Sequence, residues 1–173
     1  RNTPQRLSEK NAEKIDFVVL RECTEGLFYT AAVHNRNKIA NNDEVEDIMR
    51  ITRNTTTRLH NFAFKLAEKR KKKGKLGKVT CVDKANVFKS QALFRKIFNE
   101  IKDKYPNISA DACYVDAMAL NLVRQPWEYD VMVMENIFGD ILSDLGGGLV
   151  GGMGMASCGE IGDNHGLFQP AHG

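Results

Sequence analysis

The stretch YDVMVMENIFGDILSDLGGGLV, residues 129–150, decides the fold class. Its first part, Tyr129–Met134, is a short apolar run that predicts a buried strand. Asn136 is a residue type that caps helices, and the apolar spacing from Ile137 to Val150 predicts a helix directly after the strand. A strand that leads straight into a helix is typical of α/β proteins with crossover connections.

The same alternation extends along the rest of the chain. Further strands are expected at Ile15–Leu20, Lys78–Val82 and Ala112–Val115, and Leu27–Val33 is a β-prone stretch. Helices are expected at about Asp43–Arg70, Lys89–Lys104 and Asp116–Arg124. The sequence therefore predicts an α/β fold with a mixed or parallel sheet and flanking helices.

The composition excludes several classes of protein. The chain has 173 residues, of which 42% are hydrophobic and 27% charged, which suits one sizeable core and not a disordered chain. No apolar run approaches the 18 or more residues of a membrane span. The four cysteines form no C-x-x-C pair, so reduced thiols in a cytoplasm are favoured over a disulfide framework or a metal cluster.

The net charge of +3 is unevenly distributed. Residues 1–80 carry 18 Lys and Arg against 10 Asp and Glu, and residues 81–173 carry 7 against 12. Much of the excess is one basic run, Lys69–Lys75. A nucleic-acid site is one interpretation. The end of a helix is the stronger one, because cations suit a helix C-terminus and Gly74 is placed to cap it. We therefore expect no nucleic-acid partner.

Two carboxylates, Asp140 and Asp144, lie four residues apart in the last predicted helix and so share one face. A divalent cation with oxygen ligands would offset their repulsion. Spacing alone favours two solvated carboxylates. A third carboxylate, Asp116, follows a predicted strand at the start of a helix, where it would by itself be an N-cap.

Three more polar residues follow predicted strands. Lys84 and Asn86 lie just past Lys78–Val82, and a lysine there would be a general base or a surface lysine paired with Asp83. Arg21 follows the first strand. It would hold a substrate carboxylate, or form an ordinary ion pair with Glu22 or Glu25.

Eleven of the 14 glycines lie between Gly139 and Gly173. The groups Gly146–Gly148 and Gly151–Gly154 would form a phosphate-binding loop or allow close helix packing. Neither a G-x-G-x-x-G after a strand nor a Walker sequence is present.

Taken together and in order, five motifs are specific. They are Arg21-Glu22-x-Thr24-Glu25-Gly26, Val82-Asp83-Lys84-Ala85-Asn86, Val115-Asp116-Ala117-Met118-Ala119, the run Asn136 to Asp144, and Pro170-Ala171-His172-Gly173. Their series closely resembles the β-decarboxylating dehydrogenases, the family of isopropylmalate, isocitrate, homoisocitrate and tartrate dehydrogenases. The resemblance runs through nearly the whole chain.

The resemblance implies an oxidoreductase. Such enzymes oxidise a malate-type 2-hydroxy acid with NAD or NADP, release CO₂ and need Mg²⁺ or Mn²⁺. It implies catalytic roles for Lys84 and Asp116, substrate binding by Arg21 and Lys84, cofactor contacts from Asn86, His172 and Gly173, and metal ligation by Asp116, Asp140 and Asp144. 3-Isopropylmalate, and with it leucine biosynthesis, is favoured. An isocitrate-, homoisocitrate- or tartrate-type enzyme, or a non-catalytic subunit, are the alternatives.

The family also implies a homodimer with shared active sites and no membrane contact. Residues 1–134 would be the central substrate, metal and dimerisation domain, with a protruding β arm at about 27–42. Residues 135–173 would be an interface helix and a return towards a cofactor domain. We expect a cytoplasmic protein, or one of an organellar matrix in a eukaryote. Because family members are longer, the chain is expected to be incomplete and inactive by itself.

One position departs from the family pattern. The family has a Tyr seven residues after the arginine that matches Arg21, where it is the acid of the decarboxylation half. Here that position is Phe28, followed by Tyr29. Either a bulge re-aims Tyr29, or another group or water donates the proton, or decarboxylation is weak.

Overall fold

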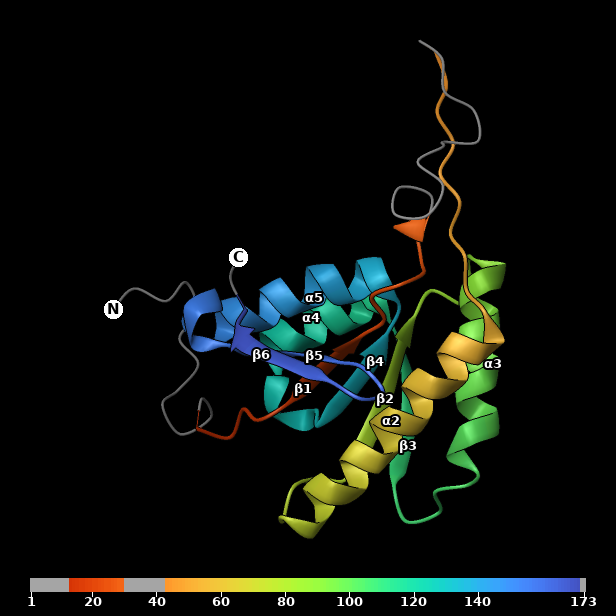
Figure 1. Ribbon diagram of the computed structural model, residues 1–173. Helices are drawn as coiled ribbons and strands as arrows, with labels where there is room; N and C mark the ends of the chain where they lie inside the picture. The colour runs from red at the N-terminus through yellow and green to blue at the C-terminus, as the bar shows by residue number, and fades with distance from the viewer. Residues whose placement is uncertain (1–12, 30–42, 172–173) are drawn as a thin grey trace.

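The computed structural model describes residues 13–29 and 43–171. Four strands form a sheet in the order β1 (Val18–Arg21), β4 (Val131–Met134), β2 (Lys78–Asp83) and β3 (Ser109–Tyr114). All neighbouring pairs are parallel, so the four carboxyl ends meet at one edge of the sheet (Figure 1). The predicted α/β fold with a parallel sheet is confirmed.

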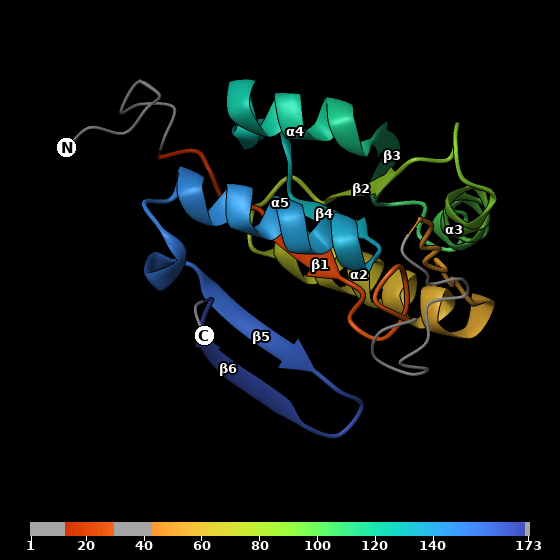
Figure 2. The same cartoon turned by 90° about the horizontal axis from the view of Figure 1, so that it is seen from above.

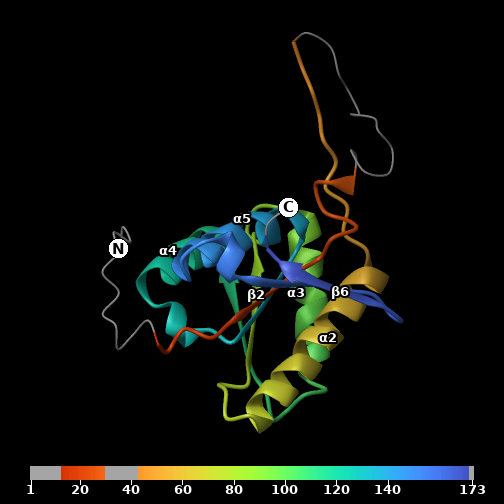
Figure 3. The ribbon, with the colours of Figure 1, turned by 60° about the vertical axis from the view of Figure 1, so that its left-hand side comes forward.

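Helices cover both faces of this sheet. The helices α2 (Arg53–Lys72) and α3 (Lys89–Lys102) lie on one face, and α4 (Val115–Arg124) and α5 (Asn136–Leu149) lie on the other (Figures 2 and 3). Each face has its own apolar core, and β4 is buried at all four positions because it lies between two partners and two helix layers. A strand buried on both faces needs an unbroken apolar run, which is why VMVM predicted it.

The start of α2 is a correction. The helical spacing predicted a helix from Asp43, but α2 begins at Arg53. Two long-range contacts keep the preceding residues out of the helix. Gly26 and Arg50 exchange main-chain hydrogen bonds of 2.8 and 3.1 Å, and the Glu25 carboxylate accepts from the main-chain N–H of Thr52 at 2.8 Å. Sequence periodicity does not register such contacts.

The basic run belongs to the end of α2, as predicted. Gly74 has a φ of +81° and follows the cap, a conformation that glycine adopts without strain. Arg70 donates to the buried Asp130 and, at 2.9 Å, to Asp16, and Lys71 donates to a main-chain carbonyl before β3 at 2.5 Å. These cations therefore join the helix end to the sheet.

Smaller differences concern element ends. The first strand was predicted from Ile15 and begins at Val18. The predicted cap Asn136 is wrong, because Glu135 caps α5. In the β-prone stretch from Leu27, Leu27 and Phe28 form a turn and not a strand, and residues 30–42 of the predicted arm lie outside the described residues. The division into two domains stays a prediction.

Two short 3₁₀ turns complete the helical elements: η2 (Pro126–Glu128) lies between α4 and β4, and η3 (Met153–Met155) follows α5. After η3 the chain forms an antiparallel hairpin that the sequence did not predict. It consists of β5 (Ser157–Ile161) and β6 (Gly166–Pro170), and it stands apart from the main sheet (Figure 2). The Phe168 ring lies across Gly159 of the facing strand, where a Cβ would come within 3.1 Å of it. Glycines therefore make room for this ring in the hairpin. Within the described ranges, no helix is long and apolar enough to cross a membrane.

Candidate active site

The carboxyl edge of the parallel sheet collects the polar residues that the sequence singled out. Arg21 ends β1, Asn136 begins α5 after β4, Lys84 follows β2, and Asp116 lies in the first turn of α4 after β3. Sites in α/β proteins gather at this edge because loops and helix N-termini from several strands meet there.

Arg21 is held by α5. Its Nη1 donates to the Asp140 carboxylate, and its Nε donates to Asn136 Oδ1 at 2.9 Å. The predicted alternative, an ion pair with Glu22 or Glu25, is therefore wrong. Gly139 makes this contact close, because a Cβ there would lie 2.6 Å from the Cβ of Arg21. The guanidinium thus lies against the first turns of α5.

Asn136 and Glu135 organise the start of α5. Asn136 also donates from its Nδ2 to the carbonyl of Glu25 at 3.1 Å, so it joins the helix to the loop after β1. The Glu135 carboxylate accepts from the N–H groups of Ile137 and Phe138 at 3.2 and 3.1 Å. Burial raises the pKa of Glu135, and these two bonds act in the opposite direction. No sequence pattern pointed to Glu135, because glutamate is not among the preferred cap residues.

The loop after Arg21 is fixed by two more carboxylates, whose role in the site no local sequence pattern predicted. Glu22 accepts from the main-chain N–H groups of Thr24 and Glu25 at 2.8 and 2.6 Å. Glu25 in turn accepts from Thr52 at the start of α2. Both are buried, at 7% and 9% exposure. Their side chains hold the loop in one conformation, and Arg21 leaves the sheet in a fixed direction as a result.

Lys84 and Asp116 form a second pair at the same edge. Lys84 Nζ donates to the Asp116 carboxylate, so the predicted alternative partner Asp83 is wrong. Asp83 is fully buried and instead accepts two bonds from Arg95, at 2.7 and 2.8 Å. The hydrogen bond from Lys84 lowers the pKa of Asp116, and main-chain N–H groups of the first turn of α4 add to this. Asp116 is not the N-cap, because Tyr114 occupies that position.

The three predicted metal carboxylates do not come together within one chain. Asp140 is half-buried against Arg21, while Asp144 is exposed and has no hydrogen bond or ion pair with the described residues. Asp116 follows β3, three strand positions away from β1, which is about 14 Å at the spacing of sheet strands. No group of three His, Cys, Asp or Glu suited to a metal occurs in residues 13–29 and 43–171.

Of the predicted cofactor residues, Asn86 is exposed in the turn between β2 and α3, and His172 and Gly173 lie outside the described residues. The position of the family tyrosine is also clear. The Phe28 ring lies 5.5 Å from the Arg21 guanidinium, and the Tyr29 ring lies 4.5 Å from that of Arg50. The Tyr29 ring therefore faces a different arginine from the Phe28 ring.

Comparison with known proteins identifies the family. A family model described as "Isocitrate/isopropylmalate dehydrogenase" matches residues 2–173. The chain belongs to the isocitrate/isopropylmalate dehydrogenase family. The relationship predicted from the five motifs is thereby confirmed.

Individual members of the family show how similar this chain is. It is 46% identical over 160 residues to the 3-isopropylmalate/3-methylmalate dehydrogenase of Methanocaldococcus jannaschii. This match covers 92% of the chain and 46% of that protein. It is 43% identical over 164 residues to the homoisocitrate dehydrogenase of the same organism, with 94% and 44% covered. The isocitrate dehydrogenase of Methylococcus capsulatus is a structural neighbour, with a TM-score of 0.80, 40% identity, and 91% and 45% of the two chains covered.

The chain thus spans less than half the length of the relatives it matches. Relatives whose names give different substrates have nearly the same sequence identity to this chain, 46% and 43%. Sequence identity therefore shows the family but does not distinguish between these substrates.

Proposed function

We propose that the protein is a β-decarboxylating dehydrogenase that oxidises a malate-type 2-hydroxy acid with NAD or NADP and a divalent cation, with 3-isopropylmalate favoured. One observation carries the proposal. In a chain of this family, the carboxyl edge of the sheet holds both an arginine paired with Asp140 and a lysine paired with Asp116. The cations of these pairs are complementary to the carboxylates of a hydroxy-dicarboxylate, and the aspartates are complementary to a metal ion.

Arg21 would bind the substrate. Its guanidinium offers a planar set of donors, and a carboxylate fits such a set with two parallel bonds. Asp140 and Asn136 hold it in this conformation. A substrate carboxylate would compete with Asp140 for Arg21, and binding would leave the Asp140 carboxylate free for another partner.

Asp140 and Asp144 would hold Mg²⁺ or Mn²⁺, with Asp116 as the third carboxylate. The donors fit, because hard divalent cations prefer oxygen ligands and Asp144 has no competing partner within the described part of the chain. When bound, such an ion polarises the substrate oxygens and stabilises negative charge that develops on them. Lys84 lies in contact with Asp116, so both would reach the same point of the site, where Lys84 would take part in removing the hydroxyl proton.

A homodimer with shared sites would bring these residues together. The separation of about 14 Å between the ends of β1 and β3 supports this, because Arg21 and Asp116 of one chain are too far apart to bind one small acid. Exposed apolar side chains on α4 and α5 support it as well, with Leu120 54% and Ile141 58% exposed. Lys84 and Asp116 of one subunit would then complete the site around Arg21 of the other.

The test is a dehydrogenase assay on the full-length protein. Candidate substrates are 3-isopropylmalate, homoisocitrate, isocitrate and tartrate, each with NAD or NADP, and with Mn²⁺ or a chelator. We expect metal-dependent reduction of the nicotinamide with one of them, lost in Asp140→Asn and in Lys84→Ala. Asp111→Asn is the matched control, because it removes an aspartate that pairs with Lys78 away from this edge. Activity that survives chelation and both site variants contradicts the proposal.

Two alternatives give different results in the same assay. Homoisocitrate as the best substrate would place the protein with its second relative from M. jannaschii. A non-catalytic subunit would be inactive with every substrate, but the chain retains Lys84 and all three aspartates, which favours catalysis. Because the chain spans less than half of its relatives, we expect residues 1–173 alone to be inactive.

A further inference from the structure

Tyr114 connects two cations that come from different elements. Its ring is 4.8 Å from the Arg95 guanidinium of α3 and 5.8 Å from the Lys84 ammonium that follows β2. Aromatic rings attract cations through the negative charge of their faces, most strongly where water is partly excluded. Lys84 and Arg95 are only 24% and 26% exposed, so these contacts are partly shielded from water.

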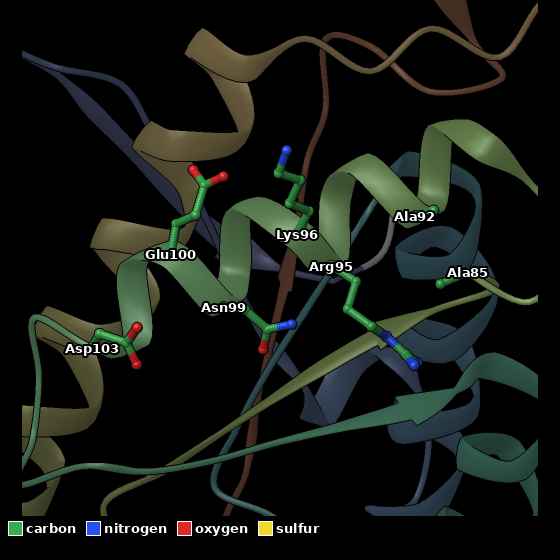
Figure 4. A pocket seen from close by; sticks show the side chains of 7 residues that line it. All are labelled: Ala85, Ala92, Arg95, Lys96, Asn99, Glu100 and Asp103. Atoms are coloured by element: carbon green, nitrogen blue, oxygen red, sulfur yellow. The ribbon is translucent and has the colours of Figure 1, made fainter.

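Arg95 is fixed from the opposite side. Its side chain extends from α3 towards the ends of β2 and β3, whereas Lys96 and Glu100 of the same helix point away from them (Figure 4). There it donates two hydrogen bonds to the fully buried Asp83. A buried carboxylate with a bidentate guanidinium has little freedom to move, so Arg95 offers the ring a rigid support.

The sheet places the ring beside this anchor. Asp83 and Tyr114 are paired residues of the parallel strands β2 and β3. Paired residues of parallel strands point to the same face, which here is the face covered by α3. Asp83 also accepts from the main-chain N–H of Ala85 at 2.8 Å, so the same carboxylate fixes the main chain on both sides of Lys84.

We propose that Tyr114 and Arg95 are positioning residues for Lys84: the Arg95-supported ring of Tyr114 directs the lysine side chain to Asp116. Lysine has a long stem with several rotatable bonds, and one contact with an exposed carboxylate does not define its conformation. The carboxylate that Lys84 contacts is of this kind, because the Asp116 side chain is 66% exposed. The Tyr114 ring gives the Lys84 ammonium a second point of contact. The assignment rests on the proposed function only in so far as Lys84 acts in catalysis.

The first test uses the full-length protein and the substrate found in the assay above. Tyr114→Leu removes the ring and is expected to lower kcat about tenfold, with KM changed less than about twofold. Tyr114→Phe keeps the ring and is expected to retain kcat within about twofold. This split between the variants separates the ring from the hydroxyl, and it separates positioning of Lys84 from loss of substrate binding.

The second test does not require activity. Lys84 is labelled with an amine-reactive ester in chelator-treated protein, and the labelled peptides are quantified against the exposed Lys89. We expect the labelling rate of Lys84 to rise at least about threefold in Tyr114→Leu and to stay unchanged in Tyr114→Phe. Tyr114 is 36% exposed on an edge strand, so both variants are expected to fold, and Tyr114→Met is a second ringless variant if Tyr114→Leu does not.

Folded ringless variants with unchanged kcat and unchanged labelling would overturn the assignment, as would equal losses in Tyr114→Leu and Tyr114→Phe. If the full-length protein has no dehydrogenase activity, the proposed function fails, and the labelling ratio still decides whether Tyr114 positions Lys84.

Discussion

The contact between Gly139 and Arg21 predicts that stability and substrate binding respond to one methyl group. A Cβ at position 139 would lie 2.6 Å from the Cβ and Cγ of Arg21 and 3.1 Å from its Cα. Ordinary carbon contacts are about 3.5–4.0 Å. Because a main-chain atom is among the neighbours, a rotamer change of Arg21 cannot relieve the clash, and α5 must shift from β1.

Two terms set the size of the effect of Gly139→Ala. Replacing glycine by alanine inside a helix stabilises by about 0.5–1 kcal/mol, whereas overpacking costs about 1–3 kcal/mol. We expect a net loss of about 1–2 kcal/mol in the free energy of unfolding. Gly148→Ala in the same helix is the matched control, because nothing lies within 4 Å of a Cβ there. It is expected to gain about 0.5 kcal/mol.

The assay is urea unfolding of both variants and the unchanged protein, with the KM of the hydroxy acid as a second measurement. A difference of about 2 kcal/mol between the variants corresponds to about 1 M urea at a slope of about 2 kcal/mol/M. The KM is expected to rise in Gly139→Ala only, because Arg21 is displaced. If both variants have the same midpoint and KM, the close approach of α5 to Arg21 does not hold.

Three further predictions concern single side chains. Burial lowers the pKa of His60 to about 3, so the folded state keeps it neutral while the unfolded state takes up a proton below about pH 6.5. Between pH 6.5 and 5, the free energy of unfolding of the unchanged protein should therefore fall by about 2 kcal/mol more than that of His60→Phe, as measured by urea unfolding. Parallel pH profiles of the two proteins would contradict this. Lys84→Met should raise the pKa of Asp116 towards its ordinary value of 3.8, followed by carboxyl NMR in chelator-treated protein, and an unmoved titration would mean that the pair does not persist in solution. Phe28→Tyr should increase decarboxylation relative to oxidation, because it restores a hydroxyl beside Arg21; a constant ratio of CO₂ to reduced cofactor would show that this acid is not limiting.

Local patterns were sufficient where one strand or helix makes its own contacts. The run VMVM predicted a buried strand, and the position of Gly74 after a basic helix end predicted a cap, because burial on both faces and a positive φ each need particular residue types. The beginning of α2 was not predictable in the same way. It depends on Glu25 and Gly26, which are distant in sequence from Thr52 and Arg50.

In the candidate site, the choice of residues was likewise predictable from the sequence, whereas their partners were not. The sequence selected Arg21, Lys84, Asp116, Asp140 and Asp144 because they follow strands or share a helix face, and the order of the motifs predicted the family. The ion pairs that it offered as alternatives, each with a neighbour in the chain, are not the ones that form. Arg21 binds Asp140 and Lys84 binds Asp116 because parallel strands bring together residues separated by 119 and 32 positions.

The α/β class, the family and the chemical types at the sheet edge could be read from the chain, because they depend on residue type, spacing and order. Three features follow from the three-dimensional arrangement: which charges neutralise each other, that Glu135 and not Asn136 caps α5, and that Tyr114 lies between two cations. Such contacts depend on strand order and register, and no local pattern in the chain carries that information.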